Sequence, residues 1–308
     1  MTTPLYNSYS SHFKKIFGQR IQKVTINAGF SCPNRDGKIA TGGCTFCLNE
    51  AFNPSYCSPK KSITQQIDEG IEFHSRRYAK TTKFLAYFQA FSNTYKPLDQ
   101  LKKIYQEALD HPEVIGLIIG TRPDCIDNEK LEYLAEIAKT HYVTIEYGVE
   151  SIFDKTLAEI NRGHNFQTAK EAIELTAKYN INCGAHFILG LPGETQQMHI
   201  DQCDVINSLP LTTIKFHQLQ IMKGTAMEID YNQNPSKYHF FELDQYIDLM
   251  VDIFERLRAD LIIERFAGES PPRYHAGHPW GLVRNEKLWQ MLEKRLKERN
   301  TYQGRLHQ

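Results

Sequence analysis

Short apolar runs alternate with longer amphipathic stretches along the chain, and this alternation restricts the possible folds more than any other feature. The runs are rich in β-branched and aromatic residues, as expected for strands buried in a parallel sheet. They predict six strands, at residues 23–28, 84–90, 114–120, 142–148, 183–189 and 213–219.

Helical patterns occupy the stretches between these runs. The first starts at Ser62, and Ser62 with Gln65 has the spacing of a capping box. Crossovers between parallel strands are right-handed almost without exception, so successive units curl in one direction. We therefore expect an α/β fold, an open partial TIM-like (β/α)6 barrel of parallel strands, with helices at residues 62–80, 98–110, 128–139, 166–179 and 195–208.

The limits of this pattern divide the chain into three parts. We expect an N-terminal extension over residues 1–20, the partial-barrel core over residues 21–225, and a small α/β C-terminal extension over residues 226–308. The C-terminal extension is predicted to contain a helix at residues 242–258, a strand at residues 261–266 and a basic helix near its end.

The basic helix lies in a tail with an excess of positive charge. Residues 271–308 contain eight Lys and Arg but three Glu, although the whole chain has 36 residues of each sign. The helix is either an ordinary solvated face or a surface that contacts RNA. An apolar side at helical spacing favours the first interpretation; it consists of Leu288, Met291, Leu292 and Leu296.

The cysteines and the N-terminus indicate where the protein works. The chain has seven cysteines, an odd number, and four of them are widely spaced, which is typical of a reducing compartment. The first residues lack a basic segment followed by an apolar run, and no stretch approaches the ~18 uninterrupted apolar residues of a membrane span. We expect a cytoplasmic protein without a membrane partner.

Polar side chains and glycines gather where the predicted strands end. In barrels of this kind, active-site residues lie at the C-terminal ends of the strands. All six ends carry such residues: three cysteines after the first strand, residues 89–95, 121–124, 146–151 and 190–194 after the next four, and His217 with Gln218 in the sixth.

Cys32, Cys44 and Cys47 lie close together, with eleven and then two residues between them. A structural zinc site needs a fourth ligand, and the possible ones, His12 and Cys57, have no regular spacing. An iron–sulfur cluster on three cysteines leaves one iron for a small molecule with amino and carboxylate groups, such as S-adenosylmethionine. The spacing favours the cluster but leaves zinc and inert packing thiols open.

The residues around these cysteines carry a resemblance. Phe46 stands between the last two cysteines, and Gly42 and Gly43 precede them. The segment GFSCPNRDGKIATGGCTFC resembles the radical S-adenosylmethionine superfamily and, within it, the YhcC/YtqA-like group, which is similar in outline to the core of the Elongator catalytic subunit. The resemblance is strong over residues 20–225 and extends to YFQAFSNT, GTRPDC, EYGVES, INRGH, HFILGLPGET and IKFHQLQIMKGT.

The resemblance implies a cofactor set and residues that hold it. Cys32, Cys44 and Cys47 would ligate a [4Fe-4S] cluster that cleaves S-adenosylmethionine to a 5′-deoxyadenosyl radical. The implied contacts to S-adenosylmethionine are, by role, Phe46 over the adenine, Gln89 on the methionyl amino group, Glu146 or Glu150 on the ribose, Arg162 on the methionyl carboxylate, and Gly190 and Gly193 as backbone beside the adenine. Gln89 stands where a Gly-Gly-Glu-like motif is usual, so this match is imperfect.

Other residues are expected at the open mouth, where a substrate approaches. Arg122, Asp124 and His217 are the catalytic candidates, with His164 and Lys223 nearby. Plain structural roles stay open: Glu150 as a helix cap, Arg162 in a surface ion pair, His217 as a satisfied core histidine, and the Leu-Pro-Gly-Glu segment as an ordinary helix start.

The resemblance also indicates a substrate, the wobble uridine of tRNA. The expected step converts the 5-carboxymethylaminomethyl-uridine side chain toward aminomethyl, and an electron donor such as flavodoxin or ferredoxin would reduce the cluster. Two alternatives remain: a radical enzyme that acts on a small molecule such as a tetrapyrrole, and a zinc-stapled RNA-binding module without catalysis.

Overall fold

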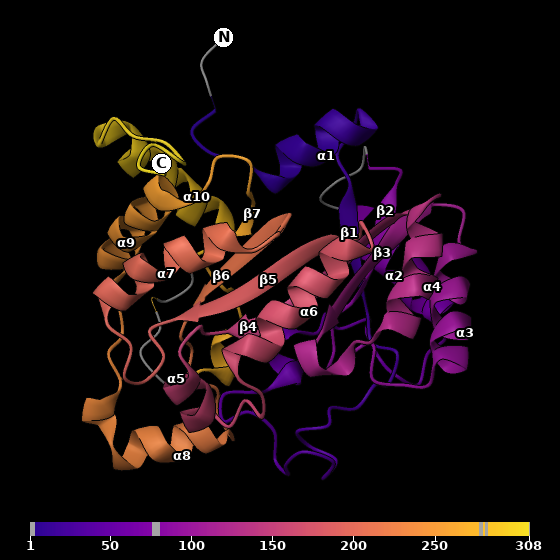
Figure 1. Ribbon diagram of the computed structural model, residues 1–308, viewed down its shortest axis with the longest axis horizontal. Helices are drawn as coiled ribbons and strands as arrows, with labels where there is room; N and C mark the ends of the chain where they lie inside the picture. The colour runs from indigo at the N-terminus through magenta and orange to yellow at the C-terminus, as the bar shows by residue number, and fades with distance from the viewer. Residues whose placement is uncertain (1–3, 76–80, 277–279, 281–282, 308) are drawn as a thin grey trace.

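A single parallel sheet forms the centre of the molecule. The computed structural model describes residues 4–75, 81–276, 280 and 283–307. Its strands pair in chain order, each parallel to the next, and the sheet curls into a half-barrel with helices on the outside (Figure 1). The strands are β1 (Gln22–Ile26), β2 (Phe84–Phe88), β3 (Val114–Thr121), β4 (Tyr142–Glu150), β5 (Asn182–Leu189), β6 (Thr213–Gln218) and β7 (Ile262–Arg265).

The predicted α/β partial barrel of parallel strands is confirmed. Each of the six apolar runs overlaps one strand, β1 to β6. The run at residues 261–266 also forms a strand, and this strand pairs with β6, so it continues the same sheet as its seventh member. The N–H of Ile262 donates to the carbonyl of Thr212 at 3.1 Å, which aligns the new edge with β6.

Seven helices match the predicted patterns, and the capping box at Ser62 is half formed. The Gln65 N–H donates to Ser62 Oγ, but the Gln65 side chain donates to Glu69. Residues 76–80 of the predicted helix 62–80 lie outside the described residues. The seven are α2 (Ile63–Ser75), α3 (Leu98–Leu109), α4 (Asn128–Ala138), α6 (Phe166–Lys178), α7 (Gln196–Ser208), α9 (Leu243–Arg256) and α10 (Asn285–Glu298).

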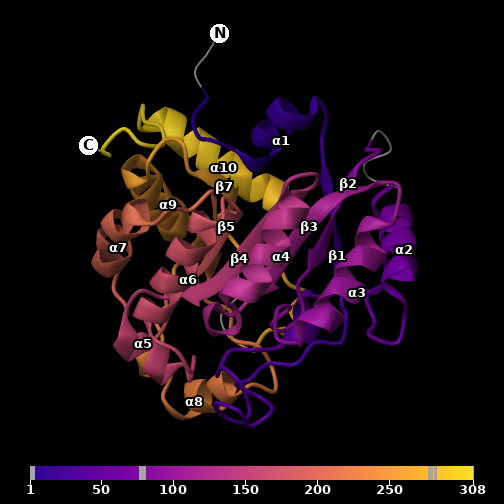
Figure 2. The ribbon, with the colours of Figure 1, turned by 45° about the vertical axis from the view of Figure 1, so that its right-hand side comes forward.

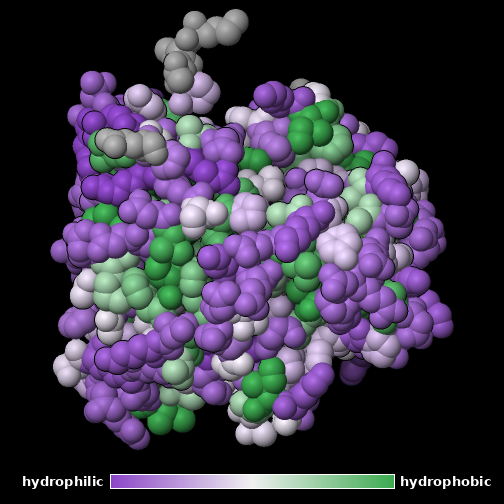
Figure 3. All heavy atoms as spheres, in the orientation of Figure 1, coloured by the Kyte–Doolittle hydropathy of each residue, from purple (hydrophilic) through white to green (hydrophobic). Residues whose placement is uncertain are grey.

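Three further helices were not predicted: α1 (Tyr9–Phe17), α5 (Asp154–Glu159) and α8 (Ala226–Gln233). All three are short, which leaves few turns for a period to show, and α8 in addition has no clear apolar side. Along the outer helices, the surface is mainly hydrophilic with small scattered hydrophobic groups (Figure 3). Among the described residues, no helix combines the length and apolar character needed to cross a bilayer.

Four charged side chains form a ring inside the half-barrel. Lys23 on β1 and Lys215 on β6 each bind both Glu146 on β4 and Glu264 on β7, at distances of 2.6–2.8 Å. Although burial alone raises the pKa of Glu146, Lys215 and Lys23 hold it well below its ordinary value. Because β1 and β7 are the two edges of the sheet, the ring connects strands that do not pair with each other.

The N-terminal segment covers the β7 edge. The N–H of Ile263 donates to the carbonyl of Asn7 at 2.8 Å, and Ser8 forms a parallel bridge to Ile263. Helix α1 packs beside this edge.

The basic helix α10 packs along α9 (Figure 2). Its apolar side is buried as expected through Leu288, Leu292 and Leu296. Three arginines at and beyond its end form ion pairs with acids of α9: Arg295 with Asp248, Arg299 with Asp252 and Arg305 with Glu255. Much of the positive charge of the tail is therefore neutralised within the protein.

Gly116 allows strands β3 and β4 to approach closely. A Cβ atom at this position would lie 1.9 Å from the backbone carbonyl oxygen of Tyr142. We expect Gly116→Ala to lower the free energy of unfolding by about 1–3 kcal/mol, since a strand must shift to admit the methyl group. Gly120→Ala on the same strand is the control; its nearest atom would be 3.2 Å away, so it should cost less. Urea unfolding followed by circular dichroism measures both, and equal stabilities would contradict the close approach.

Candidate functional site

A cavity of about 240 Å³ opens at the inner side of the half-barrel, among the loops that follow the strands. This is the end of the barrel where functional groups are expected. Residues from all seven strands of the sheet or the loops after them meet there. They include ten of the thirteen residues selected from the sequence: Cys32, Cys44, Phe46, Cys47, Gln89, Arg122, Glu146, Glu150, Arg162 and His217.

Asp124, Gly190 and Gly193 do not line the cavity. Asp124 lies one step away, because its carboxylate accepts two hydrogen bonds from Arg122, at 2.8 and 2.7 Å. The loop after β5 turns toward α7 instead of over the cavity: the N–H of Gly190 donates to Nε2 of His199. Neither glycine is among the residues that line the cavity, and the N–H of Gly190 already has a partner.

The cysteine loop is fastened to the rest of the protein by hydrogen bonds. Asn161 donates to the carbonyl of Gly43 at 2.8 Å, and the N–H of Thr45 donates to the carbonyl of Ile160 at 3.0 Å. The N–H of Met227 in α8 donates to the carbonyl of Thr45, and the ribbon shows α8 beside this loop (Figures 1 and 2). The loop conformation thus has support from protein contacts alone.

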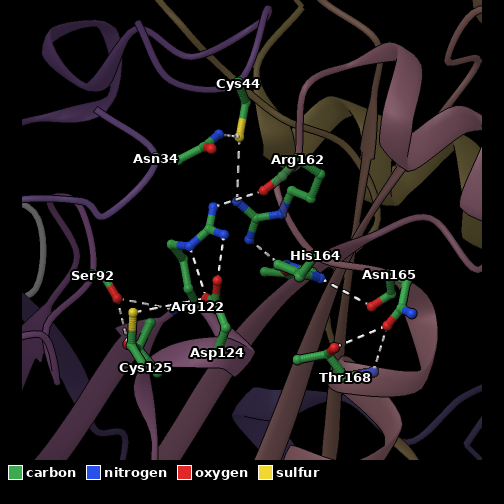
Figure 4. A network of polar contacts seen from close by, with 12 residues as sticks. Asn34, Cys44, Ser92, Arg122, Asp124, Cys125, Arg162, His164, Asn165 and Thr168 are labelled. Atoms are coloured by element: carbon green, nitrogen blue, oxygen red, sulfur yellow. Dashed lines mark hydrogen bonds and ion pairs between the residues drawn. The ribbon is translucent and has the colours of Figure 1, made fainter. Parts of the chain in front are cut away.

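Nitrogen donors point at two of the cysteine sulfurs. Arg162 Nη1 lies 3.3 Å from Cys44 Sγ, and Asn34 Nδ2 approaches the same sulfur at 3.7 Å (Figure 4). Asn49 Nδ2 lies 3.7 Å from Cys47 Sγ. Hydrogen bonds to sulfur are one means by which proteins tune iron–sulfur clusters. Burial and the neighbouring Cys44 raise the pKa of Cys47. A bound metal centre would favour the thiolate form of such a cysteine.

The geometry does not suit a single metal ion. Zinc draws all its ligands to within about 2.0–2.3 Å of one centre. Within the described ranges, no three His, Cys, Asp or Glu side chains converge in that way. An iron–sulfur cluster instead spreads its cysteine ligands over different iron atoms. The three cysteines line the same cavity, and N–H donors approach the sulfurs of Cys44 and Cys47, which fits a cluster better than zinc.

Arg162 is the centre of a polar network behind the cysteines (Figure 4). Its Nη2 donates to the carbonyl of Gly148 at 2.5 Å, and its own carbonyl accepts from Arg122 Nη1 at 2.9 Å. Burial alone lowers the pKa of Arg162. The neighbouring Cys44 and Glu150 raise it by more, so the pKa lies above its ordinary value. Its Nε is buried and has no partner among the residues described. A ligand carboxylate in the cavity would satisfy this donor.

The two carboxylates selected on β4 have different surroundings. Glu146 has 1% of its side chain exposed, and both oxygens are taken, by the two lysines of the ring and by His186 at 3.1 Å. Glu150 lies 3.8 Å from Arg162 and keeps a side chain that is 14% exposed. Glu150 is therefore the carboxylate that can accept hydrogen bonds from a ribose.

Two residues on the cavity wall have a strained backbone. Glu150 has φ of 70° and Phe91 has φ of 64°, a region that bulky residues rarely adopt. Both lie where a strand ends, and the register between β4 and β5 shifts between Gly148 and Glu150. Strain of this kind is often retained at functional sites because it aims a side chain.

The two histidines of the cavity wall lie on neighbouring strands. The ring centroids of His186 and His217 are 6.1 Å apart. Burial and the nearby Arg265 lower the pKa of His217 well below its ordinary value, so His217 is neutral. His164, which does not line the cavity, has its pKa lowered to about 3 by burial and Arg162.

Several residues of the site were not selected from the sequence: Asn49, Phe91, Lys215 and Arg265, which line the cavity, and Asn34, which approaches the Cys44 sulfur. Lys215 and Arg265 carried a usable signal, because charged residues in strands expected to be buried call for partners. The two asparagines and Phe91 carried none, since only the folded loops bring them to the cysteines or reveal the backbone strain.

Comparisons with known proteins agree with this geometry. The sequence model of a family described as the radical SAM superfamily matches residues 34–203, and one described as the radical SAM C-terminal domain matches residues 211–298. The protein YtqA of Bacillus subtilis (strain 168) is 34% identical over 309 residues, covering 100% of this chain and 94% of YtqA.

Two further similarities are to a curated relative and to a solved structure. A protein of Dehalococcoides mccartyi (strain CBDB1) named tRNA uridine(34) acetyltransferase is 25% identical over 134 residues, 42% of this chain and 28% of that protein. The structure of the archaeal Methanocaldococcus infernus Elp3 superimposes with a TM-score of 0.69 at 14% identity, covering 92% of this chain and 64% of that chain. This second similarity shows a shared fold.

The surroundings of Glu146 and Glu150 predict that the same substitution affects stability at one position and cofactor binding at the other. Glu146→Gln should lower the free energy of unfolding by about 3–5 kcal/mol, because it leaves two lysines with incomplete partners inside the barrel. Glu150→Gln should change stability little and weaken the binding of S-adenosylmethionine. Urea unfolding and calorimetric titration measure the two effects, and a stable Glu146→Gln protein with weak cofactor binding would reverse the assignment.

The buried carboxyl of Glu194 should make the stability of the folded protein depend on pH. Its carboxyl is held by Ser151 at 2.5 Å, and burial raises its pKa from 4.5 to about 7. The neighbouring His199 is neutral in this window, since burial lowers its pKa to about 4. Between pH 4.5 and about 7, Glu194 is thus protonated in the folded protein and ionised in the unfolded chain. Its contribution to the free energy of unfolding is complete below pH 4.5 and is lost as the pH rises to about 7.

The variant Glu194→Gln removes this titration. Between pH 5.5 and 7.5 the unmodified protein should lose about 2 kcal/mol of unfolding free energy relative to the variant. Chemical unfolding at several pH values gives the difference, and parallel profiles for the two proteins would argue against the raised pKa.

Proposed function

Because this chain belongs to the radical SAM superfamily, we propose that it is a tRNA-modifying enzyme that acts on the wobble uridine. Enzymes of this family use a [4Fe-4S] cluster and S-adenosylmethionine. The proposed reaction converts the side chain of 5-carboxymethylaminomethyl-uridine toward aminomethyl. A small one-electron donor such as flavodoxin or ferredoxin would reduce the cluster.

The observation that carries the radical chemistry is the meeting of three cysteines and Arg162 on one cavity wall. Cys32, Cys44 and Cys47 would hold the cluster, and the unpartnered Nε of Arg162 would bind the methionyl carboxylate. Gln89 and Glu150 would accept hydrogen bonds from the amino group and the ribose. When bound, these cofactors supply a 5′-deoxyadenosyl radical that removes a hydrogen atom from the substrate.

The chain itself positions the reactants and shields them. Asp124 holds Arg122, and Arg122 holds the backbone at Arg162, so the guanidinium that faces the cofactors has a fixed place. The cavity lies within the half-barrel, where its walls limit access of water to the reacting carbon. In the proposed substrate this carbon is next to an amine. Loss of a hydrogen atom and then of one electron there would give an imine, and the oxidised cluster would accept that electron. Water would then hydrolyse the imine to the aminomethyl group and a two-carbon oxo acid.

Support for tRNA comes from the relatives rather than from the basic tail. One relative carries the name of an acetyltransferase acting on tRNA uridine 34, and the matched part is less than a third of that protein. Acetylation is not implied, because the similarity leaves most of that protein unmatched. The α10 arginines are engaged with α9, so the tail gives little independent support.

The test is mass spectrometry of tRNA nucleosides from a strain that lacks the gene. Cys44→Ala should leave 5-carboxymethylaminomethyl-uridine accumulated and its downstream products absent, as in the deletion strain. The unmodified protein and Cys57→Ser should restore the products, because Cys57 donates to the carbonyl of Thr25 outside the cavity.

Unchanged nucleosides in the deletion strain would exclude this tRNA substrate. The radical chemistry is checked separately through the iron content and the broad absorbance near ~400 nm of protein purified without oxygen. A colourless protein with bound zinc would exclude it.

A further inference from the structure

Arg265 differs from the other cations of the cavity wall. Arg122 is paired with Asp124, Lys215 with Glu146 and Glu264, and Arg162 with Glu150 and the Cys44 sulfur. Arg35 donates to the carbonyl of Cys47. Arg265 lines the same cavity but has no hydrogen-bond or ion-pair partner among the described residues.

Arg265 is the last residue of β7, and its Cα pairs in register with Lys215 of β6. It faces the cavity from one edge of the sheet, whereas the cysteine loop follows β1 at the other edge. A ligand that fills the cavity therefore lies between the cysteines and Arg265. The influence of Arg265 on the pKa values of His217 and Tyr87 agrees with a position inside the barrel.

The acids on the surrounding strands form ion pairs with other cations, although Glu264 Oε2 has no hydrogen-bond partner among the described residues. Glu264, its neighbour in the chain, and Glu146 share the two lysines of the ionic ring. Glu150 lies beside Arg162. His217 is neutral, so it neither repels a cation nor supplies a counter-charge. Among the described residues, Arg265 thus keeps a guanidinium without an ion-pair partner, and a guanidinium is best complemented by a bidentate carboxylate.

We propose that Arg265 binds the carboxylate of the substrate side chain and so determines specificity for a carboxymethyl-amine. This inference rests on the proposed function. In 5-carboxymethylaminomethyl-uridine the carboxylate is attached to a carbon next to the amine. A bidentate contact to that carboxylate fixes this carbon relative to the cysteine wall, and it selects against the aminomethyl product, which lacks the carboxylate.

The experiment compares two anticodon stem-loop RNAs that differ in one group. One carries 5-carboxymethylaminomethyl-uridine at the wobble position, and the other carries 5-aminomethyl-uridine. Their dissociation constants are measured by fluorescence anisotropy with cluster-loaded protein and S-adenosylmethionine, without reductant. Because the phosphates are the same in both RNAs, the ratio of the two constants reports recognition of the side chain.

The unmodified protein should bind the carboxymethyl RNA about tenfold or more tightly than the aminomethyl RNA, as a charged hydrogen-bond pair provides. Arg265→Gln should abolish this preference, and Arg265→Lys should restore part of it. The control Arg273→Gln should keep it, because Arg273 is exposed and lies outside the cavity lining. Binding of S-adenosylmethionine and thermal stability should be the same in all proteins.

Three results would overturn the inference. If Arg265→Gln keeps the preference, Arg265 does not read the carboxylate, although the proposed function stands. If both RNAs bind more weakly by the same factor, Arg265 contacts a backbone phosphate. If the unmodified protein shows no preference, no carboxylate is recognised, and the nucleoside analysis of the deletion strain decides the proposed function by itself.

Discussion

The ionic ring of Lys23, Glu146, Lys215 and Glu264 determines the width of the half-barrel. Strands β1 and β7 share no backbone hydrogen bonds, so the sheet by itself does not fix the distance between its edges. The ring fixes it, because each lysine reaches both glutamates at 2.6–2.8 Å. Two positive and two negative charges balance in a region shielded from water, where an incomplete set would be costly. Tyr87 adds to this balance, since both lysines lie 4.7 Å from its ring centroid.

This width places the two sides of the cavity relative to each other. The cysteine loop leaves β1, and Arg265 ends β7, so both depend on the same ring for their separation. On the cysteine side, Arg162 links the loop to β4 through Cys44 and the carbonyl of Gly148. The ionic ring and the contacts of Arg162 thus connect the cysteine loop, β4 and β7, which are far apart in the sequence.

The sequence predicts the barrel well because its strands are buried and their apolar runs need only local periodicity to be recognised. The three cysteines are equally clear, since their spacing is local. What the sequence does not reveal depends on distant pairs. Glu146 looks like a free carboxylate in the chain, but Lys23 and Lys215 occupy it. The backbone of Gly190 appears available, but His199 takes its N–H, because the loop turns toward α7.

The contact between Asn7 and Ile263 has a consequence for how the protein is made. Asn7 and Lys23 find their partners on β7, about 240–260 residues later in the chain. Contacts of such long sequence separation form late, since the intervening chain must be ordered first. During synthesis, the cysteine loop leaves the ribosome early, but the opposite wall of its cavity does not yet exist. The edge of β1 stays without its ionic partner on β7 until residue 264 has emerged, so a truncated chain has the cysteines but cannot complete the site.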